Sequence, residues 1–134
     1  QPIYILFGHM MTRSFHISPP PMESNNPYKK KIYANISKDM PQTESLKDTF
    51  ERVVPYYHSK IEPLVLSKKN ILISAHGNSL RALCKKIFNI SDKKIVKFEI
   101  PTGNPLLIRF EDNLKVQDYK YLDIKRSKKI IFNV

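Results

Sequence analysis

The residues with the clearest chemical potential lie in the stretch Asn70–Cys84, whose sequence is NILISAHGNSLRALC. An apolar run there leads to His76, Gly77 and Asn78, and a helical pattern follows. An imidazole changes its charge near neutral pH, and a glycine lets a ligand come close to the backbone. Free N–H groups at the start of a helix attract phosphate or carboxylate. The stretch therefore predicts an anion-binding corner in which His76 stabilises a phosphoryl group during its transfer.

A structural interpretation of the same residues stays open, because a short motif is weak evidence by itself. In that interpretation His76 only caps a helix and makes a stabilising hydrogen bond. A serine hydrolase finds less support: the stretch around Ser79 lacks the second glycine of a nucleophile elbow, and all four histidines precede it. The three glycines are too far apart for a phosphate-binding loop or a dinucleotide fingerprint. No Cys/His cluster has the spacing of a zinc site, so we expect no metal.

The elements around this corner follow from the apolar pattern. The run Ile71–Ser74 has no polar alternation, which predicts a strand covered on both faces of an α/β sheet. Ligands of such sheets lie beyond the carboxyl ends of the strands, which is where His76 stands. Apolar residues at helical spacing then predict a helix over about 79–89, with Cys84 in its buried stripe.

A second apolar stripe predicts a helix over 44–67. Thr43 or Ser45 can cap its start, and Pro55 and Pro63 predict a kink or break inside it. We expect His58, which lies on this helix without a spaced partner, to be a surface residue.

The remaining chain divides into shorter elements. Ser91 and Asp92 predict the start of a short helix that ends at about Lys97. After it we expect a strand at 98–100 and a turn at 101–105. The segments 106–112 and 114–123 are expected to pair as a hairpin. Residues 1–42 are loop-rich, with a short strand near Tyr4–Phe7, and 123–134 form a basic tail. We therefore expect one domain with an α/β core over 43–122.

Composition restricts the partners. The net charge is +11, but only five of the 23 basic residues are arginines, which is typical of a solvated lysine-rich surface. Because no nucleic-acid motif is visible, we rank nucleic-acid binding last and expect neither nucleic acid nor a membrane as partner. The single cysteine fits a reducing compartment, and no apolar run is long enough to cross a membrane. We expect a cytoplasmic protein.

Three segments together resemble the cofactor-dependent phosphoglycerate mutases of the histidine phosphatase superfamily. They are ISAHGNSLRALCKKI, TESLKDTFERVVPYY before it and FEIPTGNPLLIRFEDNLK after it. The stretch TRSFHISPPPM at 12–22 is similar to that family's paired arginines and proline run. The matching segments follow one another in the family's order over about residues 12–122. The resemblance implies a fold that is part of a three-layer sheet with flanking helices, in which the N-terminal half of the domain is missing.

The resemblance also implies a function. These isomerases interconvert 2-phosphoglycerate and 3-phosphoglycerate in glycolysis and gluconeogenesis, are primed by 2,3-bisphosphoglycerate and carry the phosphoryl group on a histidine. His76 falls on the second active-site histidine, which stabilises the transferring phosphoryl group. Gly77 and Asn78 fall on ligand-contacting positions, and Thr12 and Arg13 on the paired substrate-binding arginines. The family often forms oligomers, so a homo-oligomer is an expectation here.

Two departures from the family stand out. Its nucleophile lies in an Arg-His-Gly-Glu motif, but around His9 this chain reads FGHMM, so we expect no nucleophile in it. Thr12 replaces the first paired arginine and brings no charge or guanidinium fork. We therefore expect the chain to be inactive alone. The alternative is a non-catalytic remnant that binds phosphorylated small acids. Without the first half, strand 70–74 loses a neighbour, which predicts marginal stability or self-association.

Overall fold

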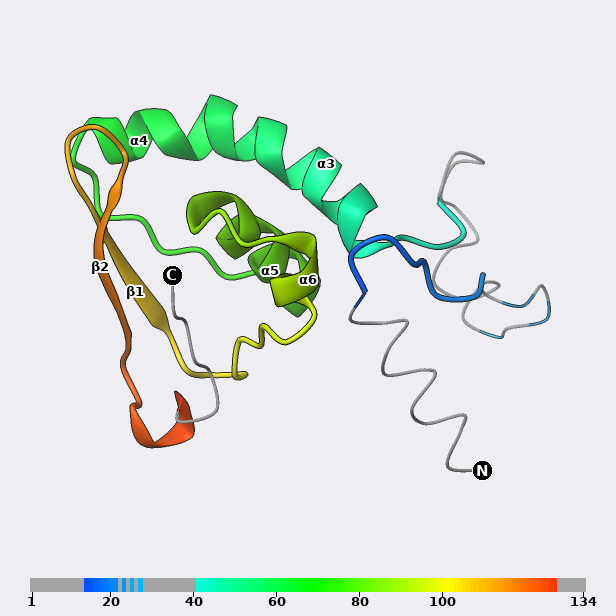
Figure 1. Ribbon diagram of the computed structural model, residues 1–134. Coiled ribbons are helices and arrows are strands. Elements are labelled where there is room, and N and C mark those ends of the chain that lie inside the picture. Colours follow the sequence, from blue (N-terminus) through cyan, green and yellow to red (C-terminus); the bar gives the residue numbers. More distant parts are fainter. Residues whose placement is uncertain (1–13, 22, 24, 26, 28–40, 128–134) are drawn as a thin grey trace.

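The computed structural model describes residues 14–21, 23, 25, 27 and 41–127 (Figure 1). In chain order, the elements of residues 41–127 are α3 (Leu46–Tyr56), η1 (Tyr57–Ile61), α4 (Glu62–Leu66), α5 (Gly77–Ile87), α6 (Asp92–Ile95), β1 (Leu106–Phe110), β2 (Val116–Tyr121) and η2 (Lys125–Ser127). Helices packed with a small sheet confirm the α/β class. The predicted strand at Tyr4–Phe7 lies outside the described residues. No helix in the described ranges has the length and apolar character that a membrane crossing requires.

The predicted helix over 44–67 is confirmed, and its irregularity lies between the two prolines. Ser45 caps α3 through a capping box, in which its hydroxyl accepts from the Asp48 N–H and its own N–H donates to the Asp48 carboxylate. From Tyr57 to Ile61 the helix widens to a π-helix. A proline ring clashes with the carbonyl four residues earlier, and the wider turn before Pro63 relieves that crowding. The result is a long arc over the rest of the fold (Figure 1).

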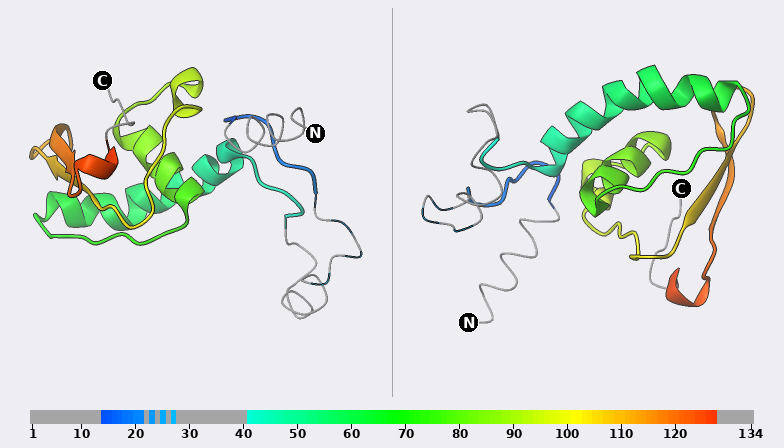
Figure 2. Two further views of the ribbon diagram at one scale, coloured as in Figure 1. Left: turned by 90° about the horizontal axis from the view of Figure 1, so that it is seen from below. Right: turned by 180° about the vertical axis from the view of Figure 1, so that it is seen from behind.

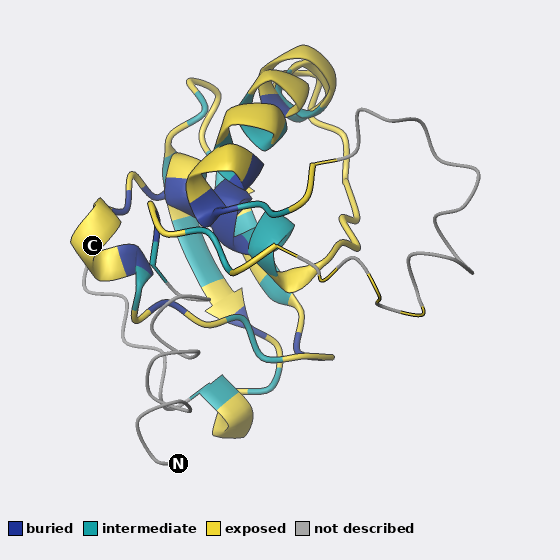
Figure 3. Ribbon diagram, turned by 90° about the vertical axis from the view of Figure 1, so that its right-hand side faces the viewer, coloured by how far each residue is buried: buried dark blue, intermediate teal, exposed yellow. Residues whose placement is uncertain are grey.

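The core forms where α5 packs against α3. Figure 3 shows buried residues gathered in the interior of the fold, and on α5 Arg81, Ala82, Leu83, Cys84 and Lys85 are all buried. Ala82 and Ile95 are fully buried. Phe15, from the N-terminal segment, joins this cluster together with Leu46, Phe88 and Phe98. Cys84 is also a core residue, as predicted, and burial raises the pKa of its thiol to about 12. The thiol is therefore protonated at neutral pH and unreactive.

The strand predicted at Ile71–Ser74 is not present. The segment is extended, but it has no strand pairing and its residues are exposed, with Leu72 at 92%. It runs back from α4 to the start of α5 beneath the helical arc (Figure 2). The expectation that both faces are covered is therefore wrong for the described residues. A strand needs a neighbour for its backbone hydrogen bonds, and β1 pairs with β2 instead.

The strand predicted at 98–100 is also wrong. Phe98 is buried, but its carbonyl accepts a hydrogen bond from Arg81 Nε at 3.1 Å. The Glu99 carbonyl accepts one from the Tyr121 hydroxyl at 3.4 Å. Side chains from α5 and β2 therefore take the acceptors that a neighbouring strand would use. The apolar residues at 98–100 suggested a strand, but the sequence does not show which groups the backbone of this segment would bind.

The predicted hairpin is confirmed. β1 and β2 pair antiparallel from Leu106 opposite Tyr121 to Phe110 opposite Val116, with an irregularity between Arg109 and Phe110. The connection closes through the Glu111 N–H to the Lys115 carbonyl, and Leu114 has a positive φ of 66°. After β2, Arg126 donates to the Thr102 and Gly103 carbonyls. This contact ties the start of the basic tail to the predicted turn at 101–105.

A buried lysine joins α5, α6 and the N-terminal segment. Lys85 Nζ donates to the Ile90 carbonyl at 2.6 Å and to Asp92 Oδ1 at 2.7 Å, and it lies 4.5 Å from the centroid of the Phe15 ring. His16 Nε2 lies 2.8 Å from the other oxygen of Asp92. Hydrogen bonds from Lys85 and His16 hold the pKa of the Asp92 carboxyl below its usual value of 3.8. The charge on Asp92 therefore stabilises the fold.

The substitution Asp92→Asn is expected to lower the free energy of unfolding at pH 7 by about 1 kcal/mol, because Asp92 is half exposed and water screens the pair. Since the folded-state pKa is lowered, the stabilisation is complete above the unfolded pKa and is lost as pH falls through the folded value. Urea unfolding at pH 7 and at about pH 2.5 measures the difference. Asp112→Asn is the control, because Asp112 pairs with Lys68 at an exposed site. An equal effect of Asp92→Asn at both pH values would contradict the assignment.

Candidate functional site

His76 begins the candidate site as the N-cap of α5. Its backbone is extended, and its Nδ1 accepts the Asn78 N–H at 3.4 Å. A neutral imidazole carries one proton, so an accepting Nδ1 places that proton on Nε2. The ring is exposed, and its Nε2–H is a donor for a ligand. His76 therefore does both things that the two interpretations expected: it caps α5, and its ring offers a donor to a ligand.

The first turn of α5 adds backbone donors to this histidine. Within the described part of the chain, the N–H groups of Gly77 and Ser79 have no hydrogen-bond acceptor, as expected in a first helical turn. The positive end of the helix dipole reinforces their attraction for an anion. A Cβ atom on Gly77 would meet nothing within 4 Å, so there is open space beside this backbone. A phosphate group therefore has room to approach the backbone at Gly77.

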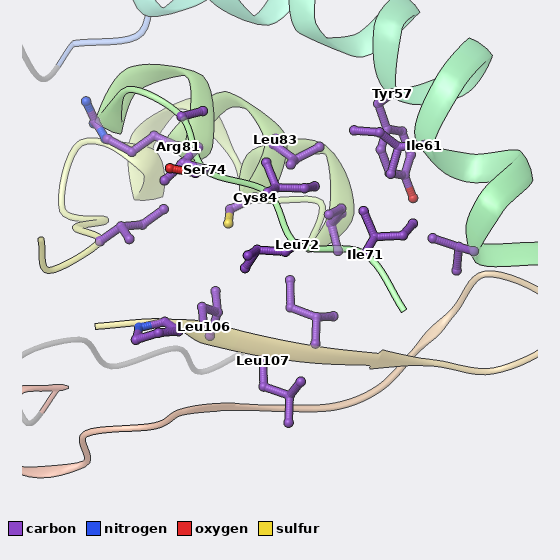
Figure 4. A pocket seen from close by; sticks show the side chains of 18 of the residues that line it. Tyr57, Ile61, Ile71, Leu72, Ser74, Arg81, Leu83, Cys84, Leu106 and Leu107 are labelled. Carbon is purple, nitrogen blue, oxygen red and sulfur yellow. The ribbon is translucent and has the colours of Figure 1, made fainter. Parts of the chain in front are cut away.

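An open cavity of about 2000 Å³ lies next to this turn, and His76, Gly77 and Asn78 are part of its lining. Figure 4 shows the cavity between the extended segment at Ile71–Ser74 and strand β1. Leu72 projects into this space from the segment, and Leu106 and Leu107 lie on opposite faces of β1. Apolar side chains thus line much of the cavity, and His76, Gly77 and Asn78 add polar groups to its lining at the start of α5. Such a site would orient a small anion by a few polar groups.

Arg81 is the residue near the site that the sequence analysis missed. It is only 8% exposed, and its guanidinium donates to Asn78 Oδ1 at 3.3 Å. Residues three apart on a helix share one face, so the spacing of Asn78 and Arg81 was the available signal. An arginine in the apolar stripe of α5 was the second signal, because a buried charge needs partners.

The other residues that the sequence pointed to lie either away from this site or outside the residues that the structure describes. Thr12, Arg13 and His9 are outside the described residues. His58 lies on η1, is exposed and pairs with Glu62 at 2.5 Å, as expected of a surface residue. In the described ranges, no three His, Cys, Asp or Glu side chains come together as a metal ion would require.

Comparison with known proteins gives this geometry a context. The family model described as histidine phosphatase superfamily (branch 1) matches residues 18–119. A 2,3-bisphosphoglycerate-dependent phosphoglycerate mutase of Pelagibacter ubique is 46% identical over 127 residues, which are 92% of this chain and 53% of the relative. A protein of the same name from Hyphomonas neptunium is 47% identical over 89% of this chain and 51% of its own length. One from Haemophilus influenzae is 47% identical over 85% of this chain and 52% of its own length. The chain spans about half the length of these relatives.

Proposed function

Because this chain belongs to the histidine phosphatase superfamily, branch 1, we propose that it serves the phosphoglycerate mutase reaction, the interconversion of 2-phosphoglycerate and 3-phosphoglycerate. The observation that carries the proposal is the start of α5, where His76 caps the helix and open space lies beside Gly77 in the lining of a cavity. Relatives at 46–47% identity are named as mutases of this kind.

In this proposal the residues have separate roles. His76 Nε2–H donates to the phosphoryl oxygens and stabilises their charge as the group is transferred. The N–H groups of Gly77 and Ser79, and the side chain of Asn78, hold the phosphate or carboxylate of the substrate. Arg13 supplies a guanidinium to the substrate, and Thr12 one hydroxyl donor.

The donors also fit 2,3-bisphosphoglycerate, the primer that the names of the relatives indicate. An imidazole donor and helix N–H groups suit a polyanion without a metal ion. When bound, this compound would supply the phosphoryl group that primes the enzyme. His76, Gly77 and Asn78 are the described residues that would hold it, and the +11 net charge of the chain would favour its approach.

The chain is expected to give no turnover of 3-phosphoglycerate by itself, because its 134 residues contain no Arg-His-Gly-Glu motif. A coupled assay with the purified chain measures this, and turnover above a His76→Ala control would contradict it. Calorimetry with 2,3-bisphosphoglycerate at two salt concentrations tests the binding part of the proposal. Saturable binding that persists at the higher salt concentration supports a specific site. Binding that disappears at the higher salt concentration indicates charge attraction alone.

A second candidate function is a non-catalytic protein that binds phosphorylated small acids. The His76 corner favours it, since holding an anion at the start of a helix needs no nucleophile. Specific binding without turnover, even when a mutase segment bearing the motif is added, would support this candidate. Under either function we propose small phosphorylated acids as partners, a cytoplasmic location and a homo-oligomer.

A further inference from the structure

We infer that Arg81 is a positioning residue, which turns the side-chain amide of Asn78 so that its NH2 group serves as an anion donor. The inference rests on the proposed function, because it concerns the same phosphate site. Arg81 lies one turn after Asn78 on α5, and its Nη1 donates to Asn78 Oδ1 at 3.3 Å.

The chemistry of the two groups decides which way the amide faces. A guanidinium has five N–H donors and no acceptor, so only the oxygen of an amide can face it. The Nδ2 group of Asn78 must then point away from Arg81. Among the described residues it has no acceptor, and Asn78 is one of the residues that line the cavity, together with His76 and Gly77. The amide therefore presents a donor, rather than an acceptor, to an anion in this cavity.

Arg81 is itself held in place by the fold. Its Nε donates to the Phe98 carbonyl at 3.1 Å and its Nη2 to the Ile95 carbonyl at 2.8 Å, both in buried surroundings. The guanidinium cannot rotate away from Asn78 without losing these bonds, and leaving a buried carbonyl unsatisfied is costly. The end of α6 and the chain after it thus fix a donor at the start of α5. Donors oriented before a ligand arrives need no reorganisation on binding.

A purely structural role for Arg81 would need only its bonds to the two carbonyls. Both roles predict a loss of stability when Arg81 is replaced, so stability cannot separate them. They differ in whether the effect on anion binding depends on Asn78. A double-mutant cycle between the two residues measures this dependence.

The first experiment measures the dissociation constant of 2,3-bisphosphoglycerate by calorimetry for the full chain and for Arg81→Lys, Asn78→Ala and the double variant. Lysine keeps the charge but lacks the planar fork that binds three acceptors at once. We expect Arg81→Lys to weaken binding about fivefold when Asn78 is present and less than about twofold in the Asn78→Ala background. An equal weakening in both backgrounds would overturn the inference.

Asn78→Asp provides a variant that keeps the bond to Arg81. A carboxylate still accepts from the guanidinium, so the fold is retained, but it presents an acceptor and a negative charge where the amide presented a donor. We expect its binding of 2,3-bisphosphoglycerate to fall more than about tenfold. Asn113→Asp is the matched control, because Asn113 lies in the β1–β2 turn and accepts the Lys115 N–H at 2.9 Å. Undiminished binding by Asn78→Asp would also overturn the inference.

A second readout needs no ligand and so separates this inference from the proposed function. Nuclear magnetic resonance of the free, 15N-labelled chain observes the Asn78 side-chain NH2 signals, assigned through their loss in Asn78→Ala. We expect these signals to shift and broaden in Arg81→Lys, because the amide loses its fixed orientation, while the Asn113 signals stay unchanged. Unchanged Asn78 signals would overturn the role of Arg81. Absence of saturable binding by the unmodified chain, with the signals shifted as expected, would instead count against the proposed function alone.

Discussion

Replacing His76 by asparagine is expected to weaken the binding of 2,3-bisphosphoglycerate by about 10- to 100-fold and to leave the fold intact, since a hydrogen bond to a charged group contributes about 1.5–3 kcal/mol. Asparagine is among the best N-cap residues, so it replaces the cap that His76 makes with the Asn78 N–H. The substitution removes the Nε2 donor of the imidazole without removing the helix start. Calorimetry measures the affinity, and urea unfolding confirms the unchanged stability.

His58→Asn is the matched control for this prediction. His58 is also exposed, but it lies on η1 and pairs with Glu62, away from the start of α5. Its substitution should leave the affinity unchanged, whereas a general effect of removing one imidazole would appear in both variants. If His76→Asn bound the bisphosphate as tightly as the unmodified chain, the structural interpretation of His76 as a helix cap would be sufficient.

We expect the chain to self-associate through the segment Ile71–Ser74, and we expect the substitution Leu72→Gln to make it monomeric. Leu72 is 92% exposed on an extended segment, and Ile71 and Ile73 beside it are 36% and 39% exposed. In the described part of the chain, the backbone of residues 70–75 makes no hydrogen bond. An apolar segment with free N–H and C=O groups is a template for pairing with another chain, so a second copy would bind there.

Burial decides the expected size of the effect on stability. Because Leu72 contributes almost no buried area, its replacement should change the free energy of unfolding by less than about 0.5 kcal/mol. Analytical ultracentrifugation over a range of concentrations measures the association. Leu122→Gln removes another exposed leucine, 61% exposed and outside the segment, and should leave the association unchanged. A chain that is already monomeric, with a sharp cooperative melt, would contradict the prediction.

Much of the helical structure and the hairpin could be predicted from the sequence, because their causes are local. The stripe over 44–67, the capping box at Ser45 and the two prolines together specify α3, η1 and α4. The hairpin follows from two alternating segments around a turn. These patterns depend on residues a few positions apart, so they can be recognised without the fold.

The two incorrect strands show where local patterns fail. An apolar run over Ile71–Ser74 suits a strand, but a strand exists only if another one pairs with it. In the structure that segment is exposed, and at 98–100 side chains of Arg81 and Tyr121 take the backbone carbonyls. Whether each segment forms a strand depends on residues distant in the sequence or on a neighbouring strand. A local apolar pattern specifies neither.

The site divides in the same way. The sequence alone determined that a histidine, a glycine and an asparagine stand at the start of a helix, and that the chain resembles a phosphoryl-transfer family. Only the tertiary structure decided that Arg81 faces Asn78, because the bonds that hold Arg81 reach carbonyls 14 and 17 residues away. Helix starts follow from neighbouring residues, whereas the orientation of a side chain at such a start depends on what the fold packs against it.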